Sequence, residues 1–245
     1  MKKILEVKNF AKRYEGKQVH QDVNFFLLEG ETLGLLGHSG TGKSVLLRSI
    51  IGLEELDQGE IIYRGQALHE LSENGLFTVR TKISYSFQSG ALFDSMSVFE
   101  NIAYPLFEHT NLREWEVGEK VEQLLNLVNL ENTGDLMPSD LSGGMQKRVG
   151  LARSMALQPD IMLYDEPTAG LDPVNVEMVL EVMKKFKDQG MSGIFVTHDI
   201  PAAKKICDRV LILKNGKIGF EGTVEQFEAS QDPFVKTFFI GAQKS

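Results

Sequence analysis

The sequence predicts an α/β fold, with a mixed sheet at its core and a helical subdomain inserted into it. Short apolar segments typical of buried strands alternate with helical segments toward both ends of the chain, whereas residues 89–156 form a mainly helical stretch. A glycine-rich loop at residues 37–44 lies between a strand pattern and a helix pattern. Together these observations predict one α/β unit that carries a phosphate-binding loop.

The individual elements follow from short apolar runs and from helical periodicity. Several strands are apolar throughout, as strands buried on both faces of a sheet should be. The expected strands are residues 4–7, 23–28, 32–36, 83–87, 161–164, 193–197, 210–214 and 217–221. The expected helices are residues 45–51, 98–106, 114–127 and 145–157. One stripe of the third helix is apolar and predicts a buried face: Val117, Val121, Leu124, Leu125 and Val128.

The composition is typical of a globular protein with a sizeable core, since 42% of the 245 residues are hydrophobic and 24% are charged. The formal net charge of -8 offers no broad basic surface, so we expect no nucleic acid partner. A single cysteine, Cys207, excludes an internal disulfide, and we expect it to be a small buried residue. Glu6 and Lys8 interrupt the apolar stretch that a signal peptide needs, and no apolar run approaches the roughly 20 residues of a membrane-spanning helix.

The segment from Gly37 to Ser44 has the spacing G-x-x-x-x-G-K-S, which builds a cradle for a triphosphate. Its glycines let successive backbone N–H groups turn toward one anion, and the dipole of the following helix favours negative charge there. Lys43 can reach the β- and γ-phosphate oxygens, and the Ser44 hydroxyl can bind Mg²⁺. The predicted nucleotide-binding residues of this segment are Ser39, Gly40, Thr41, Gly42, Lys43, Ser44 and Val45.

Two carboxylates, Asp165 and Glu166, end the apolar strand at residues 161–164. Asp165 is placed to hold Mg²⁺, as a strand-borne aspartate does in nucleotide-binding sites. Glu166 can then polarise the water that attacks the γ-phosphate, because a general base must reach that water with a hydrogen bond. An acidic pair after a strand is on its own most often a helix cap or a solvated turn, but here it follows a phosphate loop.

Residues 141–146, with the sequence L-S-G-G-M-Q, resemble the signature motif of the ATP-binding cassette (ABC) ATPases. The other motifs of that family follow in the family's order and cover nearly the whole chain. The resemblance assigns Tyr14 to the adenine platform, Gln88 to the glutamine loop, Asp165 and Glu166 to the Walker B pair, Asp172 to the D-loop and His198 to the switch histidine. It implies a P-loop NTPase fold of the ABC ATPase type.

The resemblance also implies a mechanism that needs two copies of the chain. In the family, two cassettes pack head to tail, so Ser142, Gly143 and Gly144 of one copy close over ATP held by Lys43 of the other. Gln88 then contacts Mg²⁺ and the attacking water, so the implied metal-binding residues are Ser44, Gln88 and Asp165. His198 stabilises charge on the γ-phosphate, and Asp172 acts across the dimer interface. The implied cofactors are ATP and Mg²⁺.

Residues 87–101 are similar to the glutamine-loop region of the Mla/Mce-associated ATPases, which energise phospholipid transport between membranes. Residues 165–173 and 232–241 agree with this. The resemblance implies a homodimer at the cytoplasmic face of the inner membrane, bound to integral-membrane permease subunits, with a small regulatory subunit and a lipid-binding Mce-type subunit as further partners. His38 and Val45 depart from the proline and threonine common at these positions. The implied domains are residues 1–88 with 157–222 as the ATP-binding core, 89–156 as the helical subdomain and 223–245 as a C-terminal tail.

Several alternatives stay open at this point. The ATP motifs equally suit the ATPase of another importer or exporter, for amino acids or lipoproteins, and a soluble iron–sulfur assembly ATPase is a further candidate. The apolar residues Ala91, Leu92, Phe93, Met96, Val98 and Phe99 either dock on a permease or pack inside the helical subdomain. In the tail, Val235, Phe238 and Phe239 have helical spacing, and that helix packs on its own core or reaches across the dimer.

Overall fold

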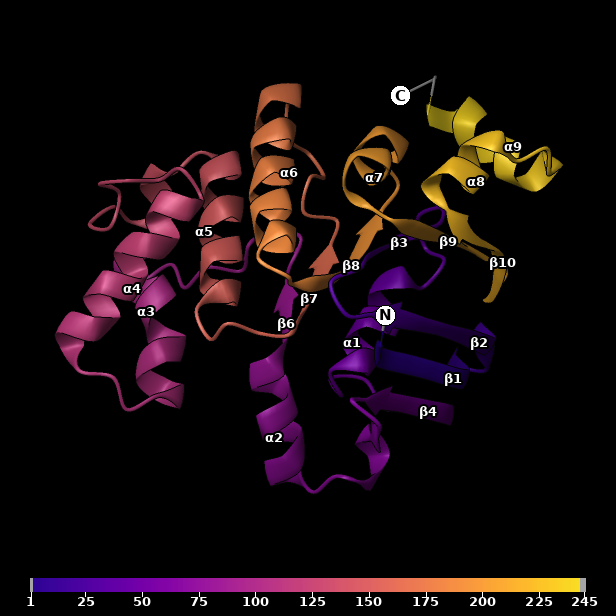
Figure 1. Cartoon of the computed structure of the whole chain (residues 1–245), viewed down its shortest axis with the longest axis horizontal. Coiled ribbons are helices and arrows are strands. Elements are labelled where there is room, and N and C mark those ends of the chain that lie inside the picture. The colour runs from indigo at the N-terminus through magenta and orange to yellow at the C-terminus, as the bar shows by residue number, and fades with distance from the viewer. Residues whose placement is uncertain (1, 243–245) are drawn as a thin grey trace. The chain divides into compact units, whose positions relative to one another are not determined.

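The computed structural model describes residues 2–242, including the side chains of residues 2–238. Residues 80–191 form one compact unit, and the described residues before and after them form the other. Each unit combines strands with helices, so the predicted α/β class is confirmed (Figure 1). The finer division into residues 1–88 with 157–222, 89–156 and 223–245 stays a prediction.

The strands of the first unit form two hydrogen-bonded groups. They are β1 (Lys3–Tyr14), β2 (Lys17–Leu28), β3 (Thr32–Leu36), β4 (Gln58–Tyr63), β5 (Gln66–Ala67), β8 (Ser192–Thr197), β9 (Arg209–Lys214) and β10 (Lys217–Thr223). One group is antiparallel, in the order β2-β1-β4-β5. The other runs β10-β9-β3-β8, with β3 parallel to both of its neighbours. The helices of this unit are α1 (Lys43–Ile50), α7 (Ile200–Ile206), α8 (Val224–Ala229), α9 (Pro233–Ala242) and the 3₁₀ turn η1 (Leu68–Glu70), and α2 (Glu73–Lys82) leads into the second unit.

Strand β3 is the centre of this unit's core. All five of its residues are buried, and α1 buries Leu46 and Leu47 completely. Cys207 packs directly against Gly34 of β3 and leaves no room for a side chain there, since a Cβ at Gly34 would lie 2.9 Å from the cysteine sulfur. Cys207 is therefore the small buried residue that the sequence predicts.

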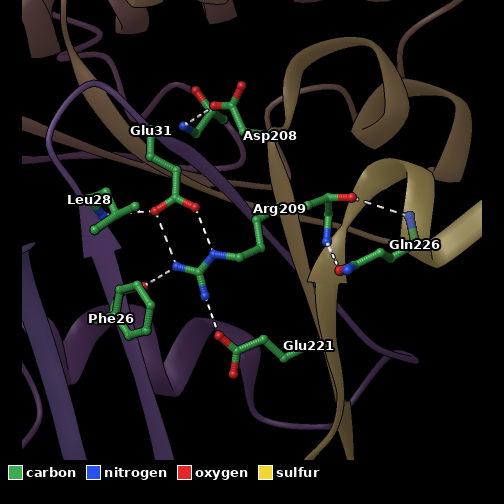
Figure 2. A network of polar contacts seen from close by, with 9 residues as sticks. Phe26, Leu28, Glu31, Asp208, Arg209, Glu221 and Gln226 are labelled. Carbon is green, nitrogen blue, oxygen red and sulfur yellow. Dashed lines mark hydrogen bonds and ion pairs between the residues drawn. The ribbon is translucent and has the colours of Figure 1, made fainter. Parts of the chain in front are cut away.

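A buried ion pair joins Arg209 of β9 to Glu31, the residue before β3 (Figure 2). The Arg209 guanidinium donates from Nε to Glu31 Oε1 at 2.8 Å and from Nη2 to Glu31 Oε2 at 3.1 Å. The same Nη2 donates to the Phe26 carbonyl at 2.6 Å, and Nη1 pairs with Glu221. Glu31 in turn accepts the Leu28 N–H at 2.8 Å. This network satisfies both buried charges and joins the ends of β2, β9 and β10.

The second unit contains two parallel strands and four helices. Its elements are β6 (Ile83–Ser86), α3 (Val98–His109), α4 (Glu114–Leu127), η2 (Pro138–Asp140), α5 (Gly143–Met155), β7 (Ile161–Asp165) and α6 (Pro173–Asp188). Helix α5 contacts α3, α4 and α6, as Figure 1 also shows. The predicted apolar stripe of α4 is buried at Val117, Val121, Leu125 and Val128, whereas Leu124 is partly exposed.

Candidate functional site

The phosphate loop lies between β3 and α1, as predicted. Gly40 and Gly42 have φ angles of 77° and 90°, a left-handed conformation that favours glycine. Lys43 is 5% exposed, and its ammonium donates to the Gly37 carbonyl at 2.8 Å and to the His38 carbonyl at 3.2 Å. The lysine therefore curls back over the loop, which keeps its positive charge beside the backbone that leads into the α1 N-terminus, a combination that suits an anion.

His20 of β2 supports this loop from behind, and sequence analysis did not identify it. Its side chain is fully buried, and Nε2 lies 2.9 Å from the Gly42 carbonyl. A carbonyl only accepts, so Nε2 carries the proton in this contact. Burial lowers the pKa of His20, although the bond to Gly42 opposes the shift, and the ring is neutral as a result. A Cβ at Gly42 would lie 2.6 Å from Nε2, so the glycine lets the imidazole reach the loop.

Tyr14, the predicted adenine platform, ends β1 and is 38% exposed. Its hydroxyl donates to Glu54 Oε2 at 2.5 Å, and Arg48 Nε donates to Glu54 Oε1 at 3.2 Å. The hydrogen bond to Glu54 raises the pKa of Tyr14. Because Arg48 belongs to α1, these bonds hold the ring in a fixed relation to the helix that begins at Lys43.

His198 follows β8 at the same sheet edge as the phosphate loop. The register of the parallel pair places Leu36 opposite Thr197, so Gly37 and His198 leave adjacent strands side by side. His198 is exposed, and Asp199 caps α7 by accepting the Ala202 N–H at 3.0 Å. The first unit thus brings two of the predicted site elements to one edge.

In the second unit, the predicted carboxylates and Gln88 likewise leave adjacent strands at one edge. Ser86 pairs with Tyr164, so Gln88, shortly after β6, and Asp165, the last residue of β7, lie at neighbouring strand ends. Tyr85 donates its hydroxyl to Asp165 Oδ2 at 2.6 Å, which fixes the carboxylate's orientation. Glu166 has a φ of 48°, in the left-handed region that residues with a side chain rarely adopt.

The signature residues open α5, and a residue that the sequence did not single out connects them to Asp172. Ser142 is the N-cap of α5 and accepts the Met145 N–H at 3.3 Å. A Cβ at Gly144 would lie 2.2 Å from Asn175 Oδ1, and Asn175 Nδ2 donates to Asp172 Oδ2 at 2.5 Å. This bond to Asn175 lowers the pKa of Asp172, which caps α6. The exposed N-terminus of α5 and the aspartate are therefore held as one piece.

The loop after Gln88 is organised by a buried asparagine of α3 and a partly exposed arginine of α5. Fully buried Asn101 accepts the Phe93 N–H at 2.8 Å and donates to the Phe93, Met96 and Ser97 carbonyls at 3.0 to 3.1 Å. Arg153 donates to the Gly90 and Ala91 carbonyls at 3.0 and 2.8 Å, and its guanidinium lies 5.3 Å from the Phe93 ring centroid.

These contacts leave a groove of about 360 Å³ beside the loop. Phe87, Phe93 and Tyr104 line it, and each of them is at least 41% exposed. Of the apolar loop residues, Val98 is buried inside the helical layer while Phe93 points outward. Packing inside the helical subdomain is therefore confirmed for Val98, whereas docking on a permease stays a prediction for the exposed Phe93.

The donor groups suit a magnesium nucleotide. The predicted metal-binding residues Ser44, Gln88 and Asp165 offer hydroxyl, amide and carboxylate oxygens, and Mg²⁺ takes one or two carboxylates together with waters and phosphate oxygens. Among residues 2–242, no group of three or more His, Cys, Asp and Glu side chains could hold a metal on its own. No helix in that part of the chain is long and apolar enough to span a membrane.

The chain is similar to known proteins over most of its length. A family model described as "ABC transporter" matches residues 20–169. The MlaF ATP-binding protein of the intermembrane phospholipid transport system of Haemophilus influenzae is 38% identical over 97% of this chain and 90% of its own length. The methionine import ATP-binding protein MetN of Legionella pneumophila is 39% identical over 88% of this chain and 63% of its own. The dimeric structure of the ATP-binding cassette MJ0796 bound to ADP and Pi covers 90% of this chain and 98% of its own, with 30% identity and a TM-score of 0.83.

Proposed function

Because the chain belongs to the ABC transporter family, we propose that it is the ATPase subunit of a transporter that moves phospholipid between membranes. Its activity is the hydrolysis of ATP to ADP and phosphate. The observation that carries the lipid assignment is the 38% identity to MlaF, which extends over 97% of this chain. An amino-acid importer is the second candidate, since MetN is 39% identical over 88% of the chain.

The residues that we assign to ATP binding lie mainly in the first unit. Lys43 neutralises the β- and γ-phosphates, and the N–H groups of the α1 N-terminus bind the same oxygens. Tyr14 stacks on the adenine, and His198 donates to the γ-phosphate as charge develops on it. Bound Mg²⁺, held by Ser44, Gln88 and Asp165, would neutralise phosphate charge.

Glu166 is the group that we assign to water activation. A carboxylate at the end of β7 accepts a proton from the attacking water, while the Tyr85 hydroxyl fixes the orientation of the neighbouring Asp165. The chemistry is otherwise a matter of positioning and of electrostatic stabilisation, as for phosphoryl transfer in general.

The signature turn would serve a second copy of the chain. The α5 N-terminus, with Ser142, Gly143 and Gly144, is a second anion-binding helix end, separate from the phosphate loop in the sequence. In the proposed homodimer it closes over ATP bound to the partner's phosphate loop, and Asp172 lies at the interface. The dimeric state of the MJ0796 cassette supports the dimer itself.

The groove beside Phe93 is the surface that we assign to the permease. Three exposed aromatic side chains on a preformed groove can receive an apolar helix or loop from an integral-membrane subunit. The ATPase would then lie at the cytoplasmic face of the inner membrane. A small regulatory subunit and an Mce-type lipid-binding subunit remain further proposed partners.

The catalytic assignment is tested by Glu166→Gln in the full chain. The variant should bind ATP, lose turnover, and elute as an ATP-bound dimer in size-exclusion chromatography. Glu181→Gln, an exposed glutamate of α6, is the matched control and should hydrolyse ATP normally. Unchanged steady-state hydrolysis in Glu166→Gln would remove Glu166 as the base.

The lipid assignment needs the native complex. We expect affinity purification of the tagged chain in mild detergent to recover a multispanning membrane protein with bound phospholipid, identified by mass spectrometry. Recovery of an amino-acid permease without phospholipid would refute the lipid assignment and leave the ATPase assignment intact.

A further inference from the structure

The C-terminal helix α9 packs on its own unit. Val235 is fully buried and Phe238 is 7% exposed, while Lys236 and Thr237, on the other side of the helix, are exposed. Of the two predicted placements of the tail, the described side chains support packing on its own core. The side chain of Phe239, the third residue of the predicted stripe, lies outside the described residues.

The buried face of α9 reaches the phosphate loop. The Phe238 ring stacks on the His38 ring, with centroids 4.9 Å apart and planes inclined by 24°. Phe234 meets Phe238 edge-on at 5.4 Å, and the Lys214 ammonium lies 4.0 Å from the Phe234 centroid. Gly219 of β10 gives Phe234 its place, since a Cβ there would lie 2.8 Å from the ring. The rings of Phe234, Phe238 and His38 therefore form an aromatic row from α9 to the phosphate loop, and Lys214 of β9 contacts its far end.

His38 connects this row to the phosphate-binding lysine. Its ring contacts Phe238, while its carbonyl accepts from Lys43 Nζ at 3.2 Å and from Thr41 Oγ1 at 2.9 Å. The contact with Phe238 limits where the His38 side chain can lie, and a side chain held in place restrains the backbone that carries it, including the carbonyl that Lys43 and Thr41 bond.

We propose that Phe238 is a positioning residue for ATP binding, which it promotes by holding His38 and so keeping the phosphate loop in its cradle shape. The proposal rests on the assignment of ATP binding to this loop. A loop that is ordered before ATP arrives loses less conformational freedom on binding, so its affinity is higher. Phe238 touches no nucleotide in this scheme and acts only through His38.

The experiment measures KM and kcat for ATP hydrolysis, together with thermal unfolding, in full-length variants. Stacked aromatic pairs have energies that correspond to about 2- to 10-fold in an equilibrium constant, so Phe238→Ala should raise the KM for ATP by about that factor. Phe238→Leu keeps an apolar side chain under α9 but removes the ring, and should show the same rise with little change in melting temperature. Phe238→Tyr keeps the aromatic ring, so its KM for ATP should match that of the unmodified chain. Lys236→Ala, on the exposed face of α9, is the matched control and should match the unmodified chain.

A double-mutant cycle separates this role from plain stabilisation. If Phe238 acts through His38, the variant with both His38→Ala and Phe238→Ala should raise the KM no more than either change alone. Additive effects, or a Phe238→Leu variant with an unchanged KM, would overturn the proposal. Lys43→Ala separates failure of this proposal from failure of the assignment of ATP binding to the loop. If Lys43→Ala also leaves ATP binding unchanged, the assignment of the loop is wrong. If Lys43→Ala binds ATP weakly while Phe238→Leu has a normal KM, only the role of Phe238 is refuted.

Discussion

Removal of Arg209 should destabilise the unit that carries the phosphate loop far more than removal of an exposed arginine. The side chains of Arg209 and Glu31 are only 13% and 6% exposed. In Arg209→Met, Glu31 keeps the Leu28 N–H as a partner but loses both guanidinium bonds, so a buried carboxylate is left without its counter-charge. Breaking a buried pair from one side costs about 3–5 kcal/mol.

This magnitude gives a clear thermal readout. For a chain of this size, each kcal/mol corresponds to about 2–4 °C in the melting temperature, so Arg209→Met should melt about 6–20 °C lower, as measured by circular dichroism at pH 7. Arg64→Met is the matched control, because Arg64 pairs with Glu29 at the surface and such pairs contribute about 0–1 kcal/mol.

The double replacement Glu31→Met with Arg209→Met tests the cause. It removes both charges from the interior, so it should be more stable than Arg209→Met alone. An Arg209→Met variant that melts like the Arg64→Met control would refute the reasoning, and so would a double variant that is less stable than both single ones.

Three further outcomes follow from the site. Because burial lowers the pKa of His20, the unfolded chain binds a proton at this histidine more readily than the folded chain does, so stability should fall as the pH drops below about 6.5. Between pH 7 and 5.5 the melting temperature of His20→Gln should fall less than that of the unmodified chain. Tyr14→Phe keeps the ring but loses the bond to Glu54, so ATP should bind about 2- to 5-fold more weakly by calorimetry, whereas equal affinity would exclude a positioning role for that bond. Gly144→Ala places a Cβ against Asn175, so the chain should still bind ATP but lose ATP-dependent dimerisation in light scattering, and a normal dimer would contradict the role of the α5 N-terminus.

The buried parallel strands were the most predictable part of the fold. Residues 32–36 and 161–164 were expected as strands and match β3 and most of β7, because short, wholly apolar runs have few other structures available. The strands β1 and β2 are much longer than residues 4–7 and 23–28 suggested. Their polar stretches are interrupted by bulges, with positive φ angles at Asn9 and Asp22, so no simple alternation marks them.

Some elements went unpredicted although a local signal exists. Helix α6 begins with Asp172 as N-cap and Pro173 at its first position, a typical helix start, but these residues were interpreted only as a motif. The predicted helices 45–51 and 145–157 differ from α1 and α5 by one or two residues at each end, and helix 98–106 begins with α3 but ends three residues earlier. Helix boundaries depend on capping contacts that periodicity does not report.

The residues expected to meet the nucleotide were predictable because their spacing is fixed by the phosphates, but the residues that hold them were not. His20 lies 22 positions from Gly42, and Asn101 lies eight positions from Phe93. Neither contact follows a spacing rule, since the first depends on the position of β2 beside the phosphate loop and the second on how the loop before α3 folds back onto that helix. A lone histidine in a strand or an asparagine inside a helix therefore has no readable role until the fold is known.

The two ends of the phosphate loop are supported by different means, and this difference bears on how the loop works. At Gly42 the support is the buried imidazole of His20, which makes one hydrogen bond to the Gly42 carbonyl and whose pKa is lowered by burial. This support therefore depends on the position of a ring that carries no charge. At His38 the support is a ring contact with α9, which belongs to the last described segment of the chain. Neither support comes from the groups assigned to the phosphates. Two related proteins can therefore have the same lysine and glycines in this loop and still differ in their affinity for ATP. The difference would come from residues outside the loop, such as His20 and Phe238, which set how ordered the loop is before ATP binds.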